Sequence, residues 1–228
     1  MPVIKLKPVA ALPALKDAVY HALREAIAEM DIYSGHEPPK LDERQLAEEL
    51  GVSRTPVREA ISCLEREGLV ISYPRRGTFV VRKTKAEILE IIAVWAALEG
   101  AAAGMATLHA SDAELASMRR MFATFDNSNE ARAHIDEYSK TNIEFHQRLI
   151  QLSKSKLLIE ITDGLFIHMR AIRRKTIGER DRAAESIIDH MRIIEALEAR
   201  DAARAERLVR EHAMYLAEHV RRHVPYLS

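Results

Sequence analysis

The sequence predicts a mainly α-helical chain in two parts: a short helical segment closed by a β-hairpin, and a longer all-α bundle of about six helices. Apolar residues recur at helical spacing through most of the chain after residue 85. β-prone runs appear as one short pair ahead of that point, joined by a turn sequence. Three of the eight glycines, Gly51, Gly68 and Gly77, fall between the short elements, where they end helices and form turns.

Composition excludes several classes of protein. The 228 residues are 47% apolar and 30% charged, which is too apolar for a disordered chain. Lys+Arg and Asp+Glu number 34 each, so the chain is not a polycation that binds nucleic acid by bulk charge. The single cysteine, Cys63, excludes a disulfide framework and a thiolate metal cluster within one chain.

The N-terminal residues do not resemble a targeting segment. Three prolines interrupt the first 19 residues, which therefore do not form a signal peptide. No window approaches the roughly 20 apolar residues that a membrane-spanning helix needs. We expect a soluble, cytoplasmic protein with no membrane partner.

The polar run at residues 82–85 lacks periodicity and is interpreted as a linker. It separates a first domain, residues 1–82, from a second, residues 83–228. Both domains contain equal numbers of acidic and basic residues, so any basic surface must come from the placement of side chains.

Residues 14–30 repeat apolar positions at helical spacing: Leu15, Val19, Leu23, Ile27 and Met30. Asp42 is expected to cap the next helix, with Gln45 as its capping-box partner and Gly51 at its end.

A third helix is expected to start with Thr55 as N-cap and Pro56 at the first helical position. Its inward side chains would be Val57, Ile61 and Leu64. The runs 69–71 and 78–81, joined by a turn, complete the order of a winged helix-turn-helix.

Downstream, the helices are expected at residues 85–109, 111–125, 129–152, 155–176, 181–199 and 202–223. The first carries Ile88, Ile91, Ile92, Trp95 and Glu99 on one side. Ser111 and Glu114 form the capping box of the second.

The third helix of the first domain carries residue types suited to reading DNA. Arg54, Thr55 and Arg58 lie in its first turn, and the donor fork of an arginine matches the O6 and N7 acceptors of guanine. The Ser53 and Thr55 hydroxyls suit phosphate oxygens, and Arg44 lies in the first turn of the preceding helix.

The hairpin turn, with Arg75, Arg76 and Gly77, suits a wing that enters the minor groove. The alternative is that these arginines form a solvated face. They would then pair with the acids of the same domain, Glu43, Glu59, Glu65 and Glu67.

The string LDERQLAEELGVSRTPVREAISCLEREGLV resembles the winged-helix domain of GntR-family bacterial transcription regulators, and RRGTFV resembles the wing of that family. The resemblance implies that Arg44, Arg54 and Arg58 contact bases and phosphates and that Arg76 and Gly77 form the wing tip. It also implies a homodimer bound to a palindromic double-stranded operator.

Three histidines lie on apolar helix stripes. His146 shares a face with Asn142 four residues earlier, and His190 and His212 lie on stripes of the last two helices. Three inward imidazoles can together bind a zinc, nickel, copper or iron ion. The alternative for each is a core histidine bonded to a backbone carbonyl.

The strings NIEFHQRLI and DHMRIIEALEARDAARAERLVREH are similar to the FCD effector-binding domain of the FadR subfamily of GntR regulators. The resemblance implies a divalent transition metal, zinc or nickel first, held by Asn142, His146, His190 and His212. It further implies a small carboxylate effector at or near the metal.

The chain departs from that family pattern twice. Asn142 is a neutral amide where an aspartate is common, so the site loses one negative charge. Trp95 stands where the family often has an arginine; we expect it, with His168, to line the effector pocket. Arg170, Arg173 and Arg174 lie off the apolar stripe of their helix and are expected to face solvent or the other domain.

The sequence thus predicts a ligand-responsive transcription regulator and not an enzyme. The family resemblance favours a repressor over an activator, and the sequence does not decide between them. One alternative is a metal-dependent hydrolytic enzyme; against it, no carboxylate near the histidines in sequence is an obvious general base. The other alternative is a regulator with a metal-free pocket.

Overall fold

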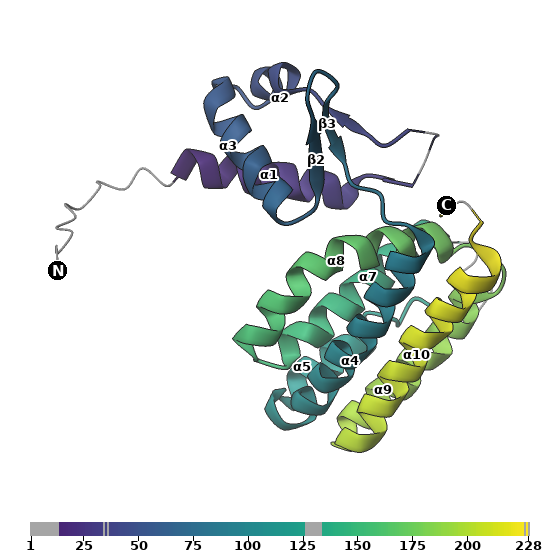
Figure 1. The fold of residues 1–228 in the computed structure, drawn as a ribbon. Helices are drawn as coiled ribbons and strands as arrows, with labels where there is room; N and C mark the ends of the chain where they lie inside the picture. Colours follow the sequence, from purple (N-terminus) through teal and green to yellow (C-terminus); the bar gives the residue numbers. More distant parts are fainter. Residues whose placement is uncertain (1–13, 34, 36, 126–133, 226, 228) are drawn as a thin grey trace, which may run out of the picture. The chain divides into compact units, whose positions relative to one another are not determined.

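The computed structural model describes residues 14–33, 35, 37–125, 134–225 and 227. The chain divides into two compact units, Met1–Val81 and Arg82–Ser228. Figure 1 shows the first as short helices with a small sheet and the second as a set of long helices.

The first unit is a winged helix-turn-helix, as predicted. Its elements are α1 (Ala14–Glu29), β1 (Lys40–Leu41), α2 (Glu43–Glu49), α3 (Arg54–Arg66), β2 (Val70–Tyr73) and β3 (Gly77–Val80). The strands form an antiparallel sheet in the order β1-β3-β2. The sequence did not predict β1, because a strand of two residues is too short to show the alternation of apolar and polar residues.

The caps of α2 and α3 correct two details. Asp42 caps α2 as expected by accepting from the backbone N–H groups of Arg44 and Gln45, but the Gln45 side chain bonds Glu49 instead of completing a capping box. The N-cap of α3 is Ser53, so the assignment of Thr55 was wrong.

Pro56 is consequently the third residue of α3 and not the first. Proline is tolerated there because the first four N–H groups of a helix have no intrahelical acceptor.

The core of this unit lies between α1 and α3. The predicted inward residues of α3 are buried, as are those of the middle of α1: Val57, Ile61, Leu64, Val19, Leu23 and Ile27. Leu15, in the first turn of α1, is 54% exposed and lies outside the core.

The second unit is an all-α bundle. Its described helices are α4 (Lys85–His109), α5 (Asp112–Arg120), α7 (Ile135–Leu152), α8 (Lys156–Thr176), α9 (Arg182–Glu198) and α10 (Ala202–His223). The Ser111–Glu114 capping box is present, but α5 ends at Arg120 and gives way to turns. Residues 129–133 of the helix expected at 129–152 lie outside the described residues.

Helix α4 is the central helix of the bundle and packs against α7, α8, α9 and α10. Its length and apolar composition would suffice to cross a membrane, so the expectation that no window does so was wrong. Eleven of its residues are buried in the bundle, among them the ionisable Glu99. The apolar character of α4 is that of a core helix.

Candidate metal centre and DNA-reading surface

Three buried histidines from three helices meet inside the bundle. His146 comes from α7, His190 from α9 and His212 from α10, with ring centroids 4.7 to 5.3 Å apart. One ring nitrogen of each lies within 4.8 Å of those of the other two. The structure therefore brings together the three histidines that the sequence singled out.

The Nδ1 atom of His146 is held by a buried carboxylate of α4. Glu99 Oε1 lies 2.5 Å from His146 Nδ1, while Glu99 Oε2 accepts from Trp95 Nε1 at 2.6 Å and from Arg173 Nη2 at 3.4 Å. Burial raises the pKa of Glu99, and the Arg173 guanidinium and the Trp95 indole N–H oppose that shift. A carboxylate with three donors around it accepts from Nδ1–H, which leaves Nε2 of His146 free of a proton.

The other two histidines also use Nδ1 for contacts away from the cluster. His212 Nδ1 lies 3.2 Å from Asp189 Oδ2, and His190 Nδ1 lies 3.5 Å from the Tyr138 hydroxyl. Carboxylate or hydroxyl partners of this kind orient an imidazole and set its tautomer when Nε2 binds a metal.

The remaining nitrogens fit a metal ion. The Nε2 atoms of His146 and His190 are buried and have no hydrogen-bond partner among the described residues. Burial lowers the pKa of both rings well below the usual value, with nearby cationic and imidazole groups adding to the shift. Both rings are therefore neutral, which is the form that coordinates zinc or nickel.

Asn142 lies one turn before His146 on α7 and is buried. Its Oδ1 accepts from Ser186 Oγ at 3.4 Å, and Ser186 lies one turn before His190 on α9. The amide is therefore buried one turn from His146 and carries no charge.

The expectation for Arg173 was wrong. It is 2% exposed, and its guanidinium lies 5.4 Å from the centre of the Trp95 ring. Its Nη1 atom is buried without a hydrogen-bond partner among the described residues. The apolar stripe of α8 is buried at Leu158, His168 and Ile172, while Ile161 is 50% exposed. In the second half of α8 the buried face is wider than one stripe and includes Arg173.

The two residues expected to line an effector pocket lie in different surroundings. Trp95 is fully buried, packs against Phe166 and reaches the cluster through Glu99. His168 is buried too, but the charges acting on it are Lys83 and Glu87, and burial lowers its pKa to about 4. Among the described residues, no hydrogen bond or ring contact joins His168 to His146, His190 or His212.

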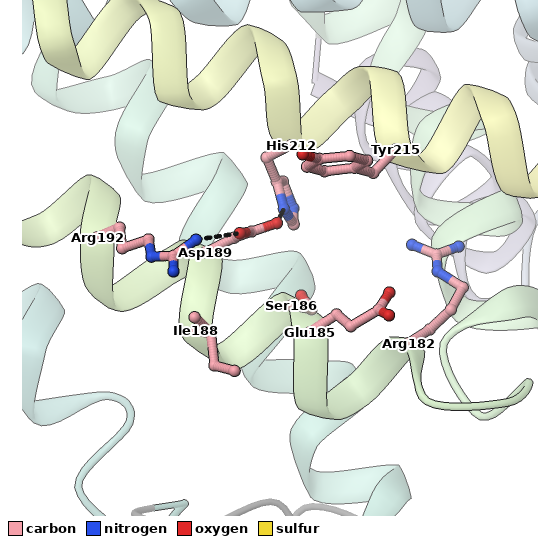
Figure 2. A pocket seen from close by; sticks show the side chains of 8 residues that line it. All are labelled: Arg182, Glu185, Ser186, Ile188, Asp189, Arg192, His212 and Tyr215. Atoms are coloured by element: carbon pink, nitrogen blue, oxygen red, sulfur yellow. Dashed lines mark hydrogen bonds and ion pairs between the residues drawn. The ribbon is translucent and has the colours of Figure 1, made fainter.

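A pocket of about 400 Å³ opens beside His212 between α9 and α10. Figure 2 shows His212 projecting from α10 toward Asp189 of α9, the ring of Tyr215 lying along α10, and Arg182 at one end of the pocket. The other lining residues are Glu185, Ile188 and Arg192. A small polar molecule in this pocket would reach the histidine cluster through His212.

The predicted DNA-reading residues of α3 share one exposed face. Ser53, Arg54, Thr55 and Arg58 are exposed, whereas Val57 on the opposite side is fully buried. Arg44 is exposed in the first turn of α2.

The alternative that acids pair with these arginines holds for Glu43, whose Oε2 accepts from Arg58 Nε at 2.7 Å and from Arg54 Nη2 at 3.3 Å. Glu65 and Glu67 are bonded elsewhere, to the Ser72 backbone N–H and to the Tyr20 hydroxyl.

The hairpin tip has the backbone of a tight turn. Arg75 has φ 63° and Gly77 has φ 108°. Arg76 is exposed and lies over the ring of Tyr73 at 5.6 Å. Both residues expected at the wing tip are thus at the turn between β2 and β3.

A winged helix-turn-helix joined to an all-α bundle is the architecture of a class of transcription regulators. Comparison with known families agrees: residues 15–80 match the bacterial regulatory proteins of the gntR family, and residues 90–214 match the FCD domain. The chain belongs to the GntR family of transcription regulators with a C-terminal FCD domain. These proteins are transcription regulators and not enzymes.

Curated relatives match along most of their length. The chain is 28% identical to the HTH-type transcriptional regulator YdhC of Bacillus subtilis over 195 residues, which cover 83% of this chain and 86% of that protein. It is 26% identical to the HTH-type transcriptional repressor RspR of Escherichia coli K12 over 203 residues. These cover 89% of this chain and 87% of RspR.

Solved structures share the fold. Escherichia coli McbR/YncC superposes with a TM-score of 0.74 at 21% identity, over 93% of this chain and all of that chain. A GntR regulator from Rhodococcus sp. RHA1 gives a TM-score of 0.68 at 22% identity, over 90% of this chain and 96% of that chain.

Sequence reasoning missed the carboxylates that contact the histidines. Asp189 directly precedes His190, and Glu99 lies on the predicted inner stripe of α4, yet neither was assigned a role. The structure thus brings two carboxylates into contact with the histidines, although no carboxylate near them in sequence was an obvious general base. The sequence feature that could have identified Glu99 is that it is the single acid on an otherwise apolar stripe of α4.

Proposed function

We propose that this protein is a cytoplasmic repressor that binds a palindromic operator as a homodimer and is released by a small carboxylate bound near a transition metal in its bundle. The observation that carries the proposal is the convergence of His146, His190 and His212, with two unpartnered Nε2 atoms, beside a pocket of about 400 Å³. Repression is suggested by the relative RspR, a transcriptional repressor.

The three histidines and Asn142 would hold the metal, zinc or nickel first. When bound, such an ion supplies a positive centre that attracts and orients an anionic ligand. Glu99 and Asp189 orient the rings of His146 and His212. Both carboxylates are engaged with imidazole nitrogens, which argues against either acting as the general base of a hydrolytic enzyme.

A metal ion held by neutral histidines and Asn142 would favour an anionic effector. Burial lowers the pKa of Arg182 to about 10, so this pocket-lining guanidinium still carries its charge at neutral pH. Arg173 has a buried Nη1 without a hydrogen-bond partner in the described structure, and Asn142 adds no negative charge. The side-chain charges otherwise balance, with Arg182 and Arg192 against Glu185 and Asp189 along the pocket and Arg173 against Glu99. The attraction for a carboxylate would therefore come from the metal.

A reader domain of this kind recognises half of a palindrome, so two copies are needed for a full operator. The bundle would have two packing arrangements of its helices, and the effector would bind one of them better. A shift to that arrangement would change the spacing of the two winged helix-turn-helix domains in the dimer. A difference of about 1–3 kcal/mol between the arrangements is enough to change operator occupancy five- to 150-fold.

The test uses the full-length chain without a histidine tag. A duplex selected from random sequence by the protein serves as operator, and its Kd is measured by fluorescence anisotropy with and without one equivalent of zinc and a panel of small carboxylates. We expect at least one carboxylate to weaken binding in the metal-loaded protein only. His190→Ala should abolish that response, whereas the exposed histidine variant His134→Ala should keep it.

A response that persists without metal and in His190→Ala would favour the metal-free pocket. Sedimentation of the protein–duplex complex tests the homodimer, with two chains per palindromic duplex as the expected result.

A further inference from the structure

We propose that Glu43 is a specificity-determining residue of the DNA reader, which holds the guanidinium groups of Arg54 and Arg58 for guanine edges and restrains them from generic phosphate contacts. The inference rests on the proposed DNA-contacting role of these two arginines. It assigns a function to an acid on a surface where acids oppose DNA binding.

A single carboxylate oxygen joins the two helices of the helix-turn-helix motif. Glu43 is the first residue of α2, Arg54 is the first residue of α3, and Arg58 lies one turn further along α3. Glu43 Oε2 accepts from Arg58 Nε at 2.7 Å and from Arg54 Nη2 at 3.3 Å. The contact is therefore between the helix expected to cross the DNA backbone and the helix expected to enter the major groove.

The acid is less exposed than the arginines that it binds. The Glu43 side chain is 29% exposed, against 56% for Arg54 and 59% for Arg58. A carboxylate in the first turn of a helix is also favoured by the helix dipole. The hydrogen bond from Arg58 lowers the pKa of Glu43, so the carboxylate is ionised at neutral pH.

The bond to Arg58 leaves both Nη groups of its guanidinium available, whereas the bond to Arg54 uses Nη2. Arginine has five N–H donors, and the bond to Arg58 uses the one on Nε, which leaves the four on the two Nη atoms. A pair of Nη donors matches O6 and N7 of guanine, the commonest specific contact in the major groove. Glu43 thus restricts where Arg58 can point without occupying its outer edge.

The same bonds make nonspecific binding less favourable. Without Glu43 the two arginines would present two positive charges to any phosphate; with it the group carries a net charge of one. Each phosphate neutralised by a cation contributes to the salt dependence of binding with a slope of about −0.9. Exposed ion pairs are worth at most about 1 kcal/mol, so a well-placed guanine can still compete for Arg54.

Other acids of the reader do not offer this contact. Glu65 bonds the Ser72 backbone, Glu67 bonds Tyr20, and Glu49 accepts from Gln45 within α2. Glu48, exposed on α2, has no recorded bond to α3. It provides a matched control, since Glu48→Gln removes the same charge from the same helix.

The experiment compares wild type, Glu43→Gln and Glu48→Gln as full-length chains. The probes are the duplex selected from random sequence and a mixed-sequence duplex of equal length, each titrated at several salt concentrations. For Glu43→Gln we expect affinity for the mixed-sequence duplex to rise three- to tenfold. The ratio of selected to mixed affinity should fall about tenfold, and the salt slope on mixed DNA should steepen by about one. Glu48→Gln should change both affinities less than twofold.

A double-mutant cycle separates positioning from a general charge effect. If Glu43 acts through Arg58, Glu43→Gln should leave the affinity ratio unchanged in an Arg58→Gln background. Equal behaviour of Glu43→Gln and Glu48→Gln, or an unchanged ratio in Glu43→Gln, would overturn the proposal. Failure of the wild type to prefer any duplex would instead contradict the proposed DNA-reading function itself.

Discussion

Glu99 and His146 lie 47 positions apart in the chain and 2.5 Å apart in the bundle, from Oε1 to Nδ1. This contact determines which nitrogen of His146 faces the cluster. Glu99 also accepts from Trp95 and Arg173, so one acid of α4 links a residue of the histidine cluster to two residues outside it. The polar centre of the bundle is built around this carboxylate.

Glu99→Gln should weaken metal binding by about 10- to 100-fold, because the negative charge that raises the basicity of His146 is replaced by a neutral amide. The measurement is a competition titration of zinc against a chromophoric chelator. Glu160→Gln, an exposed acid on α8, provides the control and should leave the affinity unchanged. Equal affinities in both variants would show that Glu99 does not support the site.

Arg173→Met should lower the free energy of unfolding by about 3–5 kcal/mol, because it leaves the buried Glu99 without a charged partner. Urea denaturation followed by circular dichroism measures the loss. The double variant Glu99→Gln/Arg173→Met should recover much of the stability, since no buried charge is left unpaired. A double variant less stable than Arg173→Met would contradict the assigned pairing.

Arg58→Ala should weaken binding to the selected duplex by about 1–3 kcal/mol and relax one base preference, as expected for loss of a guanine contact. Repeating the selection with the variant shows which position is relaxed. Arg66→Ala removes a charge from the last turn of α3 and should keep every preference. The role of Arg58 would be refuted by an unchanged site and affinity.

Gly77→Ala should destabilise the wing. The residue has φ 108°, which side-chain-bearing residues rarely adopt, and an added Cβ would lie 2.7 Å from Cε of Lys40. Backbone strain of this kind costs about 1–3 kcal/mol. Thermal unfolding should show the loss, while Gly164→Ala, in open space on α8, should show none. A melting temperature of Gly77→Ala equal to that of the wild type would contradict the strain at Gly77.

The helices were predictable because each has a strong local signal. The Ser111 capping box marked the start of α5, and α4 was expected at 85–109, which are the bounds observed. The cap of α3 was misplaced because Ser53 and Thr55 are both good N-cap residues and the choice depends on the loop before the helix. Strand β1 depends on pairing with β3, which lies far away in sequence.

The cluster itself followed from three histidines on apolar stripes, since a buried polar ring must find a partner. The partners did not follow. Which acid meets which ring depends on how α4, α7, α9 and α10 pack, and Glu99 and Asp189 have no sequence spacing to the histidines that reports this. Arg173 was missed because the second half of α8 is buried over a wider face than a single apolar stripe, and that face includes the position after Ile172.

The most direct test of the central claim is the metal content of untagged protein purified without added metal, measured by elemental analysis. The account predicts about one zinc, nickel or similar ion per chain, and none in a variant with His146, His190 and His212 all replaced by alanine. Protein that carries no such ion, and takes up none when titrated with zinc or nickel, would contradict it. The histidines would then be core residues that bond one another and water, and the search for an effector would turn to the surroundings of Trp95.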